Sequence, residues 1–169
     1  LVEEPTQLED LGELAHLRAH TNVPLATGER ITTKYPFAEI CSRHLVDYIQ
    51  PDMVHCGGIT EMKKIAALAE SFRIELLPHN PNGRVCTFAS LHLCMSSPSV
   101  TLLEMSGSED ERWDELFYGR GTVYKGGFAM APDKPGLGLE LNEKEAAKYP
   151  YQPKHWESLK WPDGAIHDR

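Results

Sequence analysis

The sequence lacks the features that mark membrane proteins and nucleic-acid-binding proteins. Its apolar runs are no longer than a β-strand, whereas a membrane-spanning helix needs about 20 predominantly apolar residues. Acidic residues outnumber basic ones by 25 to 17, and the net charge of -8 argues against a phosphate backbone as a partner. We therefore expect neither a membrane nor a nucleic acid among the partners of this protein.

Cysteine is scarce and shows no pattern. The four cysteines have no CxxC spacing, which argues against a zinc site and against a disulfide framework. Isolated thiols are typical of proteins in reducing compartments. We expect a cytoplasmic protein with buried, reduced cysteines at the following positions: Cys41, Cys56, Cys86 and Cys94.

What the sequence does contain is a recurrent ending to its short apolar runs. Five such runs each lead into an acid or a histidine, at intervals of 26, 23, 27 and 25 residues. Such an interval accommodates one strand, one helix and two loops. In a parallel barrel, reactive side chains sit at the carboxyl ends of the strands. The pattern predicts serial βα units and an active site formed by these residues: Glu3, Glu29, Asp52, His79 and Glu104.

The segments between these strands carry helical patterns. Leucines keep one face of residues 8–20 apolar. Pro36 suits the first position of a second helix, and Thr60 is a candidate N-cap for a third helix over residues 61–72. An apolar segment over residues 84–96 predicts a fourth helix. Strand and helix thus alternate, which favours an α/β fold with a parallel sheet.

The βα rhythm stops after Glu104. We therefore predict two parts, a partial β/α barrel over residues 1–105 and a C-terminal extension over residues 106–169. Within the extension, residues 123–128 predict a short hairpin, and Asn142 followed by a glutamate three positions later predicts the start of a short helix.

The first two strand ends predict a metal site. Carboxylates of Glu3 and Glu29 that converge in a barrel mouth repel each other unless a cation lies between them. Hard oxygen ligands of this kind suit Mg²⁺. Glu4 is an alternative to Glu3. Taken alone, either glutamate of the pair fits a solvated loop acid better, and only the two together, one βα period apart, favour a metal site.

The third and fourth strand ends predict an acid–base pair. Asp52 and His79 follow consecutive strands, so their side chains are expected to be neighbours. A carboxylate bonded to an imidazole fixes its tautomer, raises its basicity and orients it. Glu104, from the last strand, is a candidate hydrogen-bond donor or electrophile.

Three further side chains close to the strand ends are candidates for contact with a substrate: Arg30, His55 and Asn80. A structural ion pair explains Arg30 equally well, and loop packing explains His55 equally well. We expect only structural or solvated roles for Asn82, Lys63, Lys64 and His92.

Together these motifs resemble the enolase superfamily, and within it the mandelate racemase branch. The resemblance rests on Glu3-Glu4-Pro5, Gly28-Glu29-Arg30, Gln50-Pro51-Asp52, Pro78-His79-Asn80-Pro81 and Lys134-Pro135-Gly136-Leu137-Gly138. The last two segments look most like galactonate dehydratase and related sugar-acid dehydratases.

The resemblance implies a (β/α)₇β barrel, of the TIM type, of which this chain is the C-terminal half, from the end of strand four through strand eight. Its tail would pack on a capping domain that lies upstream. It also implies Mg²⁺ as cofactor, with Glu3 rather than Glu4 as ligand beside Glu29, an Asp52–His79 dyad, and contact between Glu104 and the carboxylate region of a sugar-acid substrate.

Three functions are consistent with these residues. The first is that of a sugar-acid dehydratase, which abstracts the proton α to a carboxylate and then eliminates water to give a 2-keto-3-deoxy sugar acid. The second is racemisation or epimerisation on the same scaffold. The third is a non-catalytic remnant that uses the barrel fold for assembly only.

The sequence also predicts how the isolated chain behaves. Leu1 falls inside a predicted strand, so we expect a segment upstream of it, and an opened barrel leaves unpaired edge strands. We expect the purified chain to self-associate or to be poorly stable, and to form no product from an aldonate. Light scattering and an assay for 2-keto acids would check both, and product formation by the chain alone would contradict the second.

Overall fold

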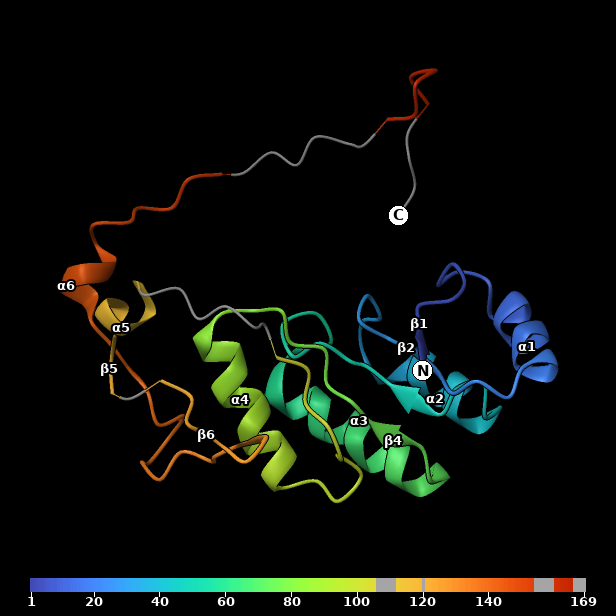
Figure 1. The fold of residues 1–169 in the computed structure, drawn as a ribbon, viewed down its shortest axis with the longest axis horizontal. Coiled ribbons are helices and arrows are strands. Elements are labelled where there is room, and N and C mark those ends of the chain that lie inside the picture. The colour runs from blue at the N-terminus through green and yellow to red at the C-terminus, as the bar shows by residue number, and fades with distance from the viewer. Residues whose placement is uncertain (106–111, 120, 154–159, 166–169) are drawn as a thin grey trace.

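The computed structural model describes residues 1–105, 112–119, 121–153 and 160–165 (Figure 1). Its centre is a parallel four-stranded sheet in the order β1-β2-β3-β4. The strands are β1 (Val2–Glu3), β2 (Leu25–Thr27), β3 (Tyr48–Ile49) and β4 (Glu75–Leu76). A parallel bridge between Leu76 and Val100 continues the sheet beyond β4.

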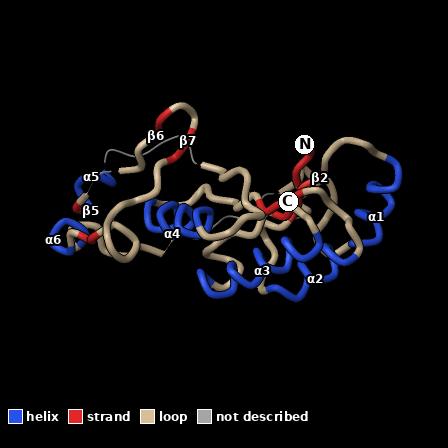
Figure 2. Tube along the Cα trace, turned by 90° about the horizontal axis from the view of Figure 1, so that it is seen from below, coloured by secondary structure: helices blue, strands red, loops and turns tan. Residues whose placement is uncertain are grey.

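A helix follows each strand of the sheet. These helices are α1 (Leu11–His20), α2 (Lys34–Ser42), α3 (Gly58–Phe72) and α4 (Arg84–Met95). Figure 2 shows α1, α2 and α3 on the same side of the strands. The alternation of strand and helix in a parallel sheet confirms the predicted α/β architecture.

The core lies between the sheet and these helices. Phe37 and Ile40 of α2, Ile49 of β3, Ile65 of α3 and Leu76 of β4 are fully buried. Burying such side chains contributes about 1.5–3 kcal/mol each to folding. The loops at the carboxyl ends of the strands extend from this packed core.

Two predicted helix starts are wrong. α2 begins at Lys34, so Pro36 occupies the third helical position, where a proline is tolerated because the first-turn N–H groups have no acceptor within the helix. α3 begins at Gly58, after Gly57 with a φ of 117°, and Thr60 lies inside the first turn. Glycine supplies this left-handed start, which side-chain capping patterns do not reveal.

Lys63 is exposed on α3, as predicted, but it also makes contacts beyond its own helix. Its ammonium donates to the Ser96 carbonyl oxygen at 2.7 Å and to the Ser97 hydroxyl at 3.2 Å. These groups lie just after α4, where a helix presents unpaired carbonyl oxygens and partial negative charge. Lys63 therefore ties α3 to the carboxyl end of α4, whereas Lys64 pairs with Glu61 on its own helix.

The C-terminal extension is built from short elements. They are α5 (Arg112–Leu116), β5 (Phe117–Tyr118), β6 (Tyr124–Lys125), β7 (Phe128–Ala129), β8 (Glu140–Leu141) and α6 (Glu143–Ala146). The antiparallel pair β6–β7 confirms the predicted hairpin. The Asn142 side chain accepts from the Glu145 N–H at 3.4 Å, which confirms the predicted cap of α6.

The extension contacts the parallel part of the chain at α4. His92 of α4 lies 3.2 Å from the Leu137 carbonyl oxygen, and Leu137 packs against the main core. His92 thus has the packing role predicted for it. The division at residue 105 and the docking of the tail on a capping domain stay predictions.

The cysteines are free thiols. Three are buried, as predicted, whereas Cys94 is partly exposed. Burial raises the pKa of Cys41, Cys56 and Cys94 to about 11, so these thiols are protonated at neutral pH. Within the described residues, none of the helices has the length and apolarity needed to cross a membrane.

The contact between Lys63 and the end of α4 can be tested by its removal. We expect Lys63→Met to lower the free energy of unfolding by roughly 0.5–1 kcal/mol, because the last carbonyl oxygens of α4 lose a cationic donor. Urea denaturation measures this. Lys64→Met is the matched control, and an equal loss in both variants would contradict the role of Lys63.

Candidate active site

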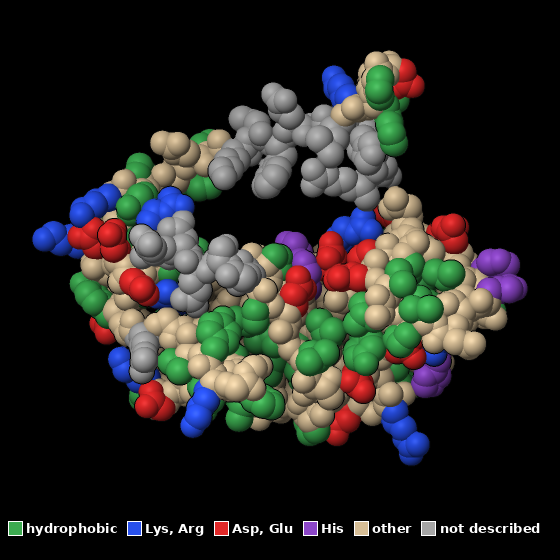
Figure 3. All heavy atoms as spheres, viewed as in Figure 1, with side chains coloured by type: hydrophobic (Ala, Val, Ile, Leu, Met, Phe, Trp, Pro, Cys, Tyr) green, Lys and Arg blue, Asp and Glu red, His purple; other side chains and the backbone are tan. Residues whose placement is uncertain are grey.

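The parallel register brings the predicted strand ends to one edge of the sheet. A bridge between Asp52 and His79 extends the pairing of β3 and β4 to this edge. The Glu104 N–H donates to the Pro78 carbonyl oxygen at 3.2 Å, which places Glu104 beside the same loop. In Figure 3, acidic and histidine side chains gather in the middle of the face shown, with basic side chains next to them. The site is built from Glu3, Glu29, Asp52, His79 and Glu104.

Asp52 and His79 form the predicted pair. The His79 Nδ1 lies 2.8 Å from the Asp52 Oδ2, and Asp52 is fully buried. Two further donors complete the carboxylate shell: the Val54 N–H, 2.7 Å from Oδ1, and the Asn82 amide, 2.8 Å from Oδ2. With its Nδ1–H bonded to Asp52, His79 has Nε2 available to accept a proton.

The contact of Asn82 with Asp52 was missed by sequence reasoning, which gave Asn82 a structural or solvated role. Its amide holds the oxygen of Asp52 that also faces His79. The signal in the sequence is a second amide residue three positions after the histidine of the same loop. Asparagine is common in turns, so this signal has little specificity.

The two predicted metal ligands come from the ends of β1 and β2, on the β2 side of this pair in the sheet. The Glu29 Oε2 is 3.3 Å from the His79 Nε2, and 31% of the Glu29 side chain is exposed. The Gln50 amide donates to the Glu3 Oε1 at 2.7 Å. Gln50, another residue that sequence reasoning missed, is buried at the end of β3, and its Oε1 has no hydrogen-bond partner among the described residues.

Glu104 is held in a site that disfavours its charge. Burial raises its pKa, and the negative charges of Glu3 and Glu29 raise it further. The charge of His79 and the Asn80 N–H act in the opposite direction but do not outweigh these effects. The Glu104 Oε2 is buried and has no hydrogen-bond partner among the described residues.

These residues fit a divalent cation. The carboxylates of Glu3 and Glu29 act on Glu104 electrostatically, so the three negative groups are close enough to repel one another. The partnerless oxygens of Gln50 and Glu104 add to an excess of acceptors over donors. All are hard oxygen atoms, as Mg²⁺ requires. In the described part of the chain, no three His, Cys, Asp or Glu residues are preassembled around a metal position.

Glu4 follows the predicted ligand Glu3 in the sequence and contacts the segment that carries the predicted ligand Glu29. Its carboxylate accepts from the Thr27 hydroxyl at 2.8 Å, the Gly28 N–H at 2.7 Å and the Arg30 guanidinium at 2.9 Å. Burial raises the pKa of Glu4, but the three hydrogen bonds and the Arg30 charge outweigh burial and hold the pKa below its usual value. Arg30 thus forms the structural ion pair that was one of its two predicted roles.

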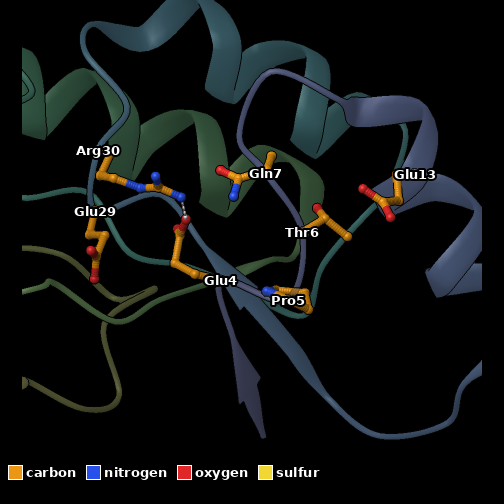
Figure 4. Close-up of a pocket in the computed structure, with 7 residues that line it drawn as sticks. All are labelled: Glu4, Pro5, Thr6, Gln7, Glu13, Glu29 and Arg30. Atoms are coloured by element: carbon orange, nitrogen blue, oxygen red, sulfur yellow. Dashed lines mark hydrogen bonds and ion pairs between the residues drawn. The ribbon is translucent and has the colours of Figure 1, made fainter. Parts of the chain in front are cut away.

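A pocket of about 640 Å³, with several charged side chains in its walls, adjoins this ion pair (Figure 4). Its walls are Glu4, Pro5, Thr6, Gln7, Glu13, Glu29 and Arg30. Glu4 and Arg30 point toward each other inside it, and Glu29 borders it. The pocket therefore opens next to the predicted metal ligands.

The other two candidates for substrate contact differ in placement. His55 is exposed, and its Nδ1 lies 3.1 Å from the Glu29 carbonyl oxygen, so it stands beside the site. Asn80 is fully buried, and its amide donates to the Thr87 hydroxyl at 3.1 Å. The structure therefore gives Asn80 a role in holding its loop to α4, and its contact with a substrate stays a prediction.

The amino-acid sequence and the fold were compared with those of known proteins. The sequence family described as Enolase C-terminal domain-like matches residues 1–145. The chain belongs to this family. With the parallel βα units, this membership confirms the predicted fold, the C-terminal part of a β/α barrel.

Curated relatives include a D-galactonate dehydratase of Ralstonia pickettii, 36% identical over 172 residues, which covers 98% of this chain and 45% of the relative. A D-galactonate dehydratase family member of Streptomyces bingchenggensis is 35% identical over 169 residues, which covers 99% of this chain and 41% of the relative. The chain thus spans less than half the length of these relatives.

Solved structures show the same similarity. An enolase from Pantoea ananatis with bound D-gluconate and Mg superimposes with a TM-score of 0.85 at 31% identity, over 97% of this chain and 40% of that one. A mandelate racemase/muconate lactonizing enzyme from Jannaschia sp. has a TM-score of 0.82 at 37% identity, over 91% and 39% of the two chains. These similarities confirm the resemblance to the mandelate racemase branch.

The raised pKa of Glu104 predicts a pH-dependent effect of its removal. A carboxyl with a raised folded pKa contributes stability that is fully present below its unfolded pKa and is lost as the pH rises through the folded pKa. We therefore expect Glu104→Gln to gain stability relative to the parent chain between about pH 4 and about pH 7.

Urea denaturation in metal-free buffer at both pH values measures this gain. Glu70→Gln, at an exposed position on α3, controls for the loss of a carboxyl elsewhere. A stability difference that is the same at both pH values in Glu104→Gln would contradict the prediction.

Proposed function

We propose that this chain supplies the acid–base and metal-binding half of a Mg²⁺-dependent sugar-acid dehydratase of the galactonate type. The observation that carries the proposal is the Asp52–His79 pair at 2.8 Å, set beside the carboxylates at the ends of β1 and β2. Relatives named D-galactonate dehydratase support the substrate class.

His79 is the base in this proposal. Its Nε2 takes the proton from C2 of an aldonate, and the electrons of the C–H bond move into the carboxylate to give an enediolate. The Asp52 carboxylate, held by its two other donors, orients the ring and stabilises the imidazolium that forms. The enediolate then expels the 3-hydroxyl group, which leaves as water after protonation, and the enol product becomes a 2-keto-3-deoxy acid.

Glu3 and Glu29 would hold Mg²⁺. The bound cation supplies positive charge next to the substrate carboxylate, which becomes more negative as the C2 proton leaves. Glu104 would contact the same carboxylate region and, in its protonated form, donate a hydrogen bond to it.

The same proposal includes the substrate class, the assembly and the compartment. The substrate is a small sugar acid, and the enzyme works as a homo-oligomer in the cytoplasm. His55, exposed beside Glu29, is a substrate-contact candidate. Racemisation or epimerisation would use the same pair, so the experiment must separate C2 proton exchange from loss of the 3-hydroxyl.

The test is a chimera in which this chain replaces the matching part of the D-galactonate dehydratase of Ralstonia pickettii. With D-galactonate and Mg²⁺ in D₂O, we expect a 2-keto-3-deoxy acid that carries deuterium at C3. We expect His79→Asn to lower kcat by about 10²–10⁴, the usual contribution of a general base. Proton NMR and a 2-keto acid assay measure both.

The controls separate the alternatives. Exchange at C2 without loss of the hydroxyl would favour racemisation or epimerisation over dehydration. His92→Asn, at the packing histidine of α4, controls for the loss of an imidazole. A folded chimera with neither exchange nor product, or with equal activity in His79→Asn, would contradict the proposal.

A further inference from the structure

Glu4 occupies a position where its backbone is strained. Its φ of 43° lies in the left-handed region, which residues other than glycine rarely adopt. The Glu4 N–H still donates to the Ala26 carbonyl oxygen at 3.0 Å, so the strain begins where the pairing of β1 and β2 ends. Observed strain of this kind persists only where the surrounding contacts impose it.

The Glu4 side chain provides such contacts, because it bonds to residues before and after Glu29 in the sequence. One oxygen accepts from the Gly28 N–H at 2.7 Å and from the Thr27 hydroxyl at 2.8 Å, and the other accepts from the Arg30 guanidinium at 2.9 Å. Gly28 and Arg30 are the residues before and after Glu29. The Glu4 side chain, next to the predicted ligand Glu3, thus holds the segment that carries the predicted ligand Glu29.

The Gly28 segment has little freedom to move away. A Cβ at Gly28 would lie 2.8 Å from the Phe37 ring and 3.0 Å from the Gln50 nitrogen, and its φ is 137°. Glycine is therefore required where the strand end passes over α2 and β3. Its N–H has the Glu4 carboxylate as its acceptor.

We propose that Glu4, together with Arg30, is a positioning residue that holds the carboxylates of Glu3 and Glu29 at the separation a divalent cation needs. The inference rests on the magnesium site of the proposed function. Without this tie, the repulsion between the two ligands would move the Glu29 segment away from Glu3. Groups that orient metal ligands typically change metal affinity 10–100-fold when they are removed.

Arg30 separates positioning from simple electrostatics. If charge alone mattered, removing the Arg30 cation near Glu29 would strengthen the binding of a metal cation. If the ion pair positions Glu29, removing Arg30 weakens cation binding in spite of the lost positive charge. The two explanations predict opposite signs for the same substitution.

The experiment is a titration of the full chain with Mn²⁺ alone, followed by electron paramagnetic resonance of the free ion. We expect Glu4→Gln and Arg30→Gln each to weaken Mn²⁺ binding about 10-fold or more. We expect Arg30→Lys, which retains a charged donor, to recover part of the affinity. Mn²⁺ affinity reports on ligand geometry and requires no turnover.

Two controls define the result. Glu39→Gln removes one carboxylate from an exposed Glu–Arg ion pair on α2, and so matches the charge change of Glu4→Gln away from the site. Glu29→Gln shows which part of the Mn²⁺ binding belongs to the site. We expect Glu39→Gln to bind Mn²⁺ as the parent chain does.

The outcomes distinguish this inference from the proposed function. Mn²⁺ binding that depends on Glu29, but is equal or tighter in Arg30→Gln, would overturn the positioning role and leave the metal site in place. A parent chain without Glu29-dependent Mn²⁺ binding would overturn the metal site and the role of Glu4 with it. If circular dichroism shows that the Glu4→Gln variant is unfolded, the Arg30→Gln variant decides the question. The Arg30 side chain is 38% exposed, so its replacement disturbs the fold less.

Discussion

Carboxylates that converge at one end of a parallel sheet repel one another, and this repulsion is the constraint to which the rest of the site responds. Glu29 lies 3.3 Å from His79, and the charges of Glu3 and Glu29 raise the pKa of Glu104. A protein keeps such groups together only by directing donors at them from rigid elements or by binding a cation. This chain has such donors. Its oxygen acceptors outnumber them, so oxygen atoms remain that could bind a cation.

The groups that hold the ligand segments and Asp52 come from residues next to the strand ends. Gln50 holds Glu3, Asn82 holds Asp52, and Glu4 with Arg30 holds the segment of Glu29. All but Arg30 are neutral amides or a carboxylate, so they orient the site without a lysine or arginine at its centre. A central cationic side chain would neutralise the negative field that attracts a metal ion.

The helices behind the site are linked to each other by charged side chains. Glu61 of α3 accepts from the Lys34 N–H at 3.1 Å and so caps α2, while Lys63 reaches the end of α4. Because α2 follows the Glu29 loop and α3 follows the Asp52 loop, these links limit the movement of both loops. Stability and site geometry therefore depend on the same interhelical contacts.

Much of the fold could be predicted from local pattern. The spacing of strand ends located the four strands of the parallel sheet, whereas the fifth predicted strand, before Glu104, is reduced to the bridge between Leu76 and Val100. Apolar periodicity located the four helices, since it reflects contacts repeated along one element. The starts of α2 and α3 and the roles of Lys63 and Asn82 could not be predicted in this way. Each depends on a partner 27 or more residues away, or on a left-handed glycine.

The sequence by itself determined which chemical groups stand at the strand ends, because strand length and the βα period decide where each apolar run stops. Only the tertiary structure decided how these groups face one another. The 2.8 Å contact of Asp52 with His79, the burial of Asn80 and the span of Glu4 across Glu29 arise when parallel strands align in register. Register is a property of neighbouring strands, which no single segment of sequence contains.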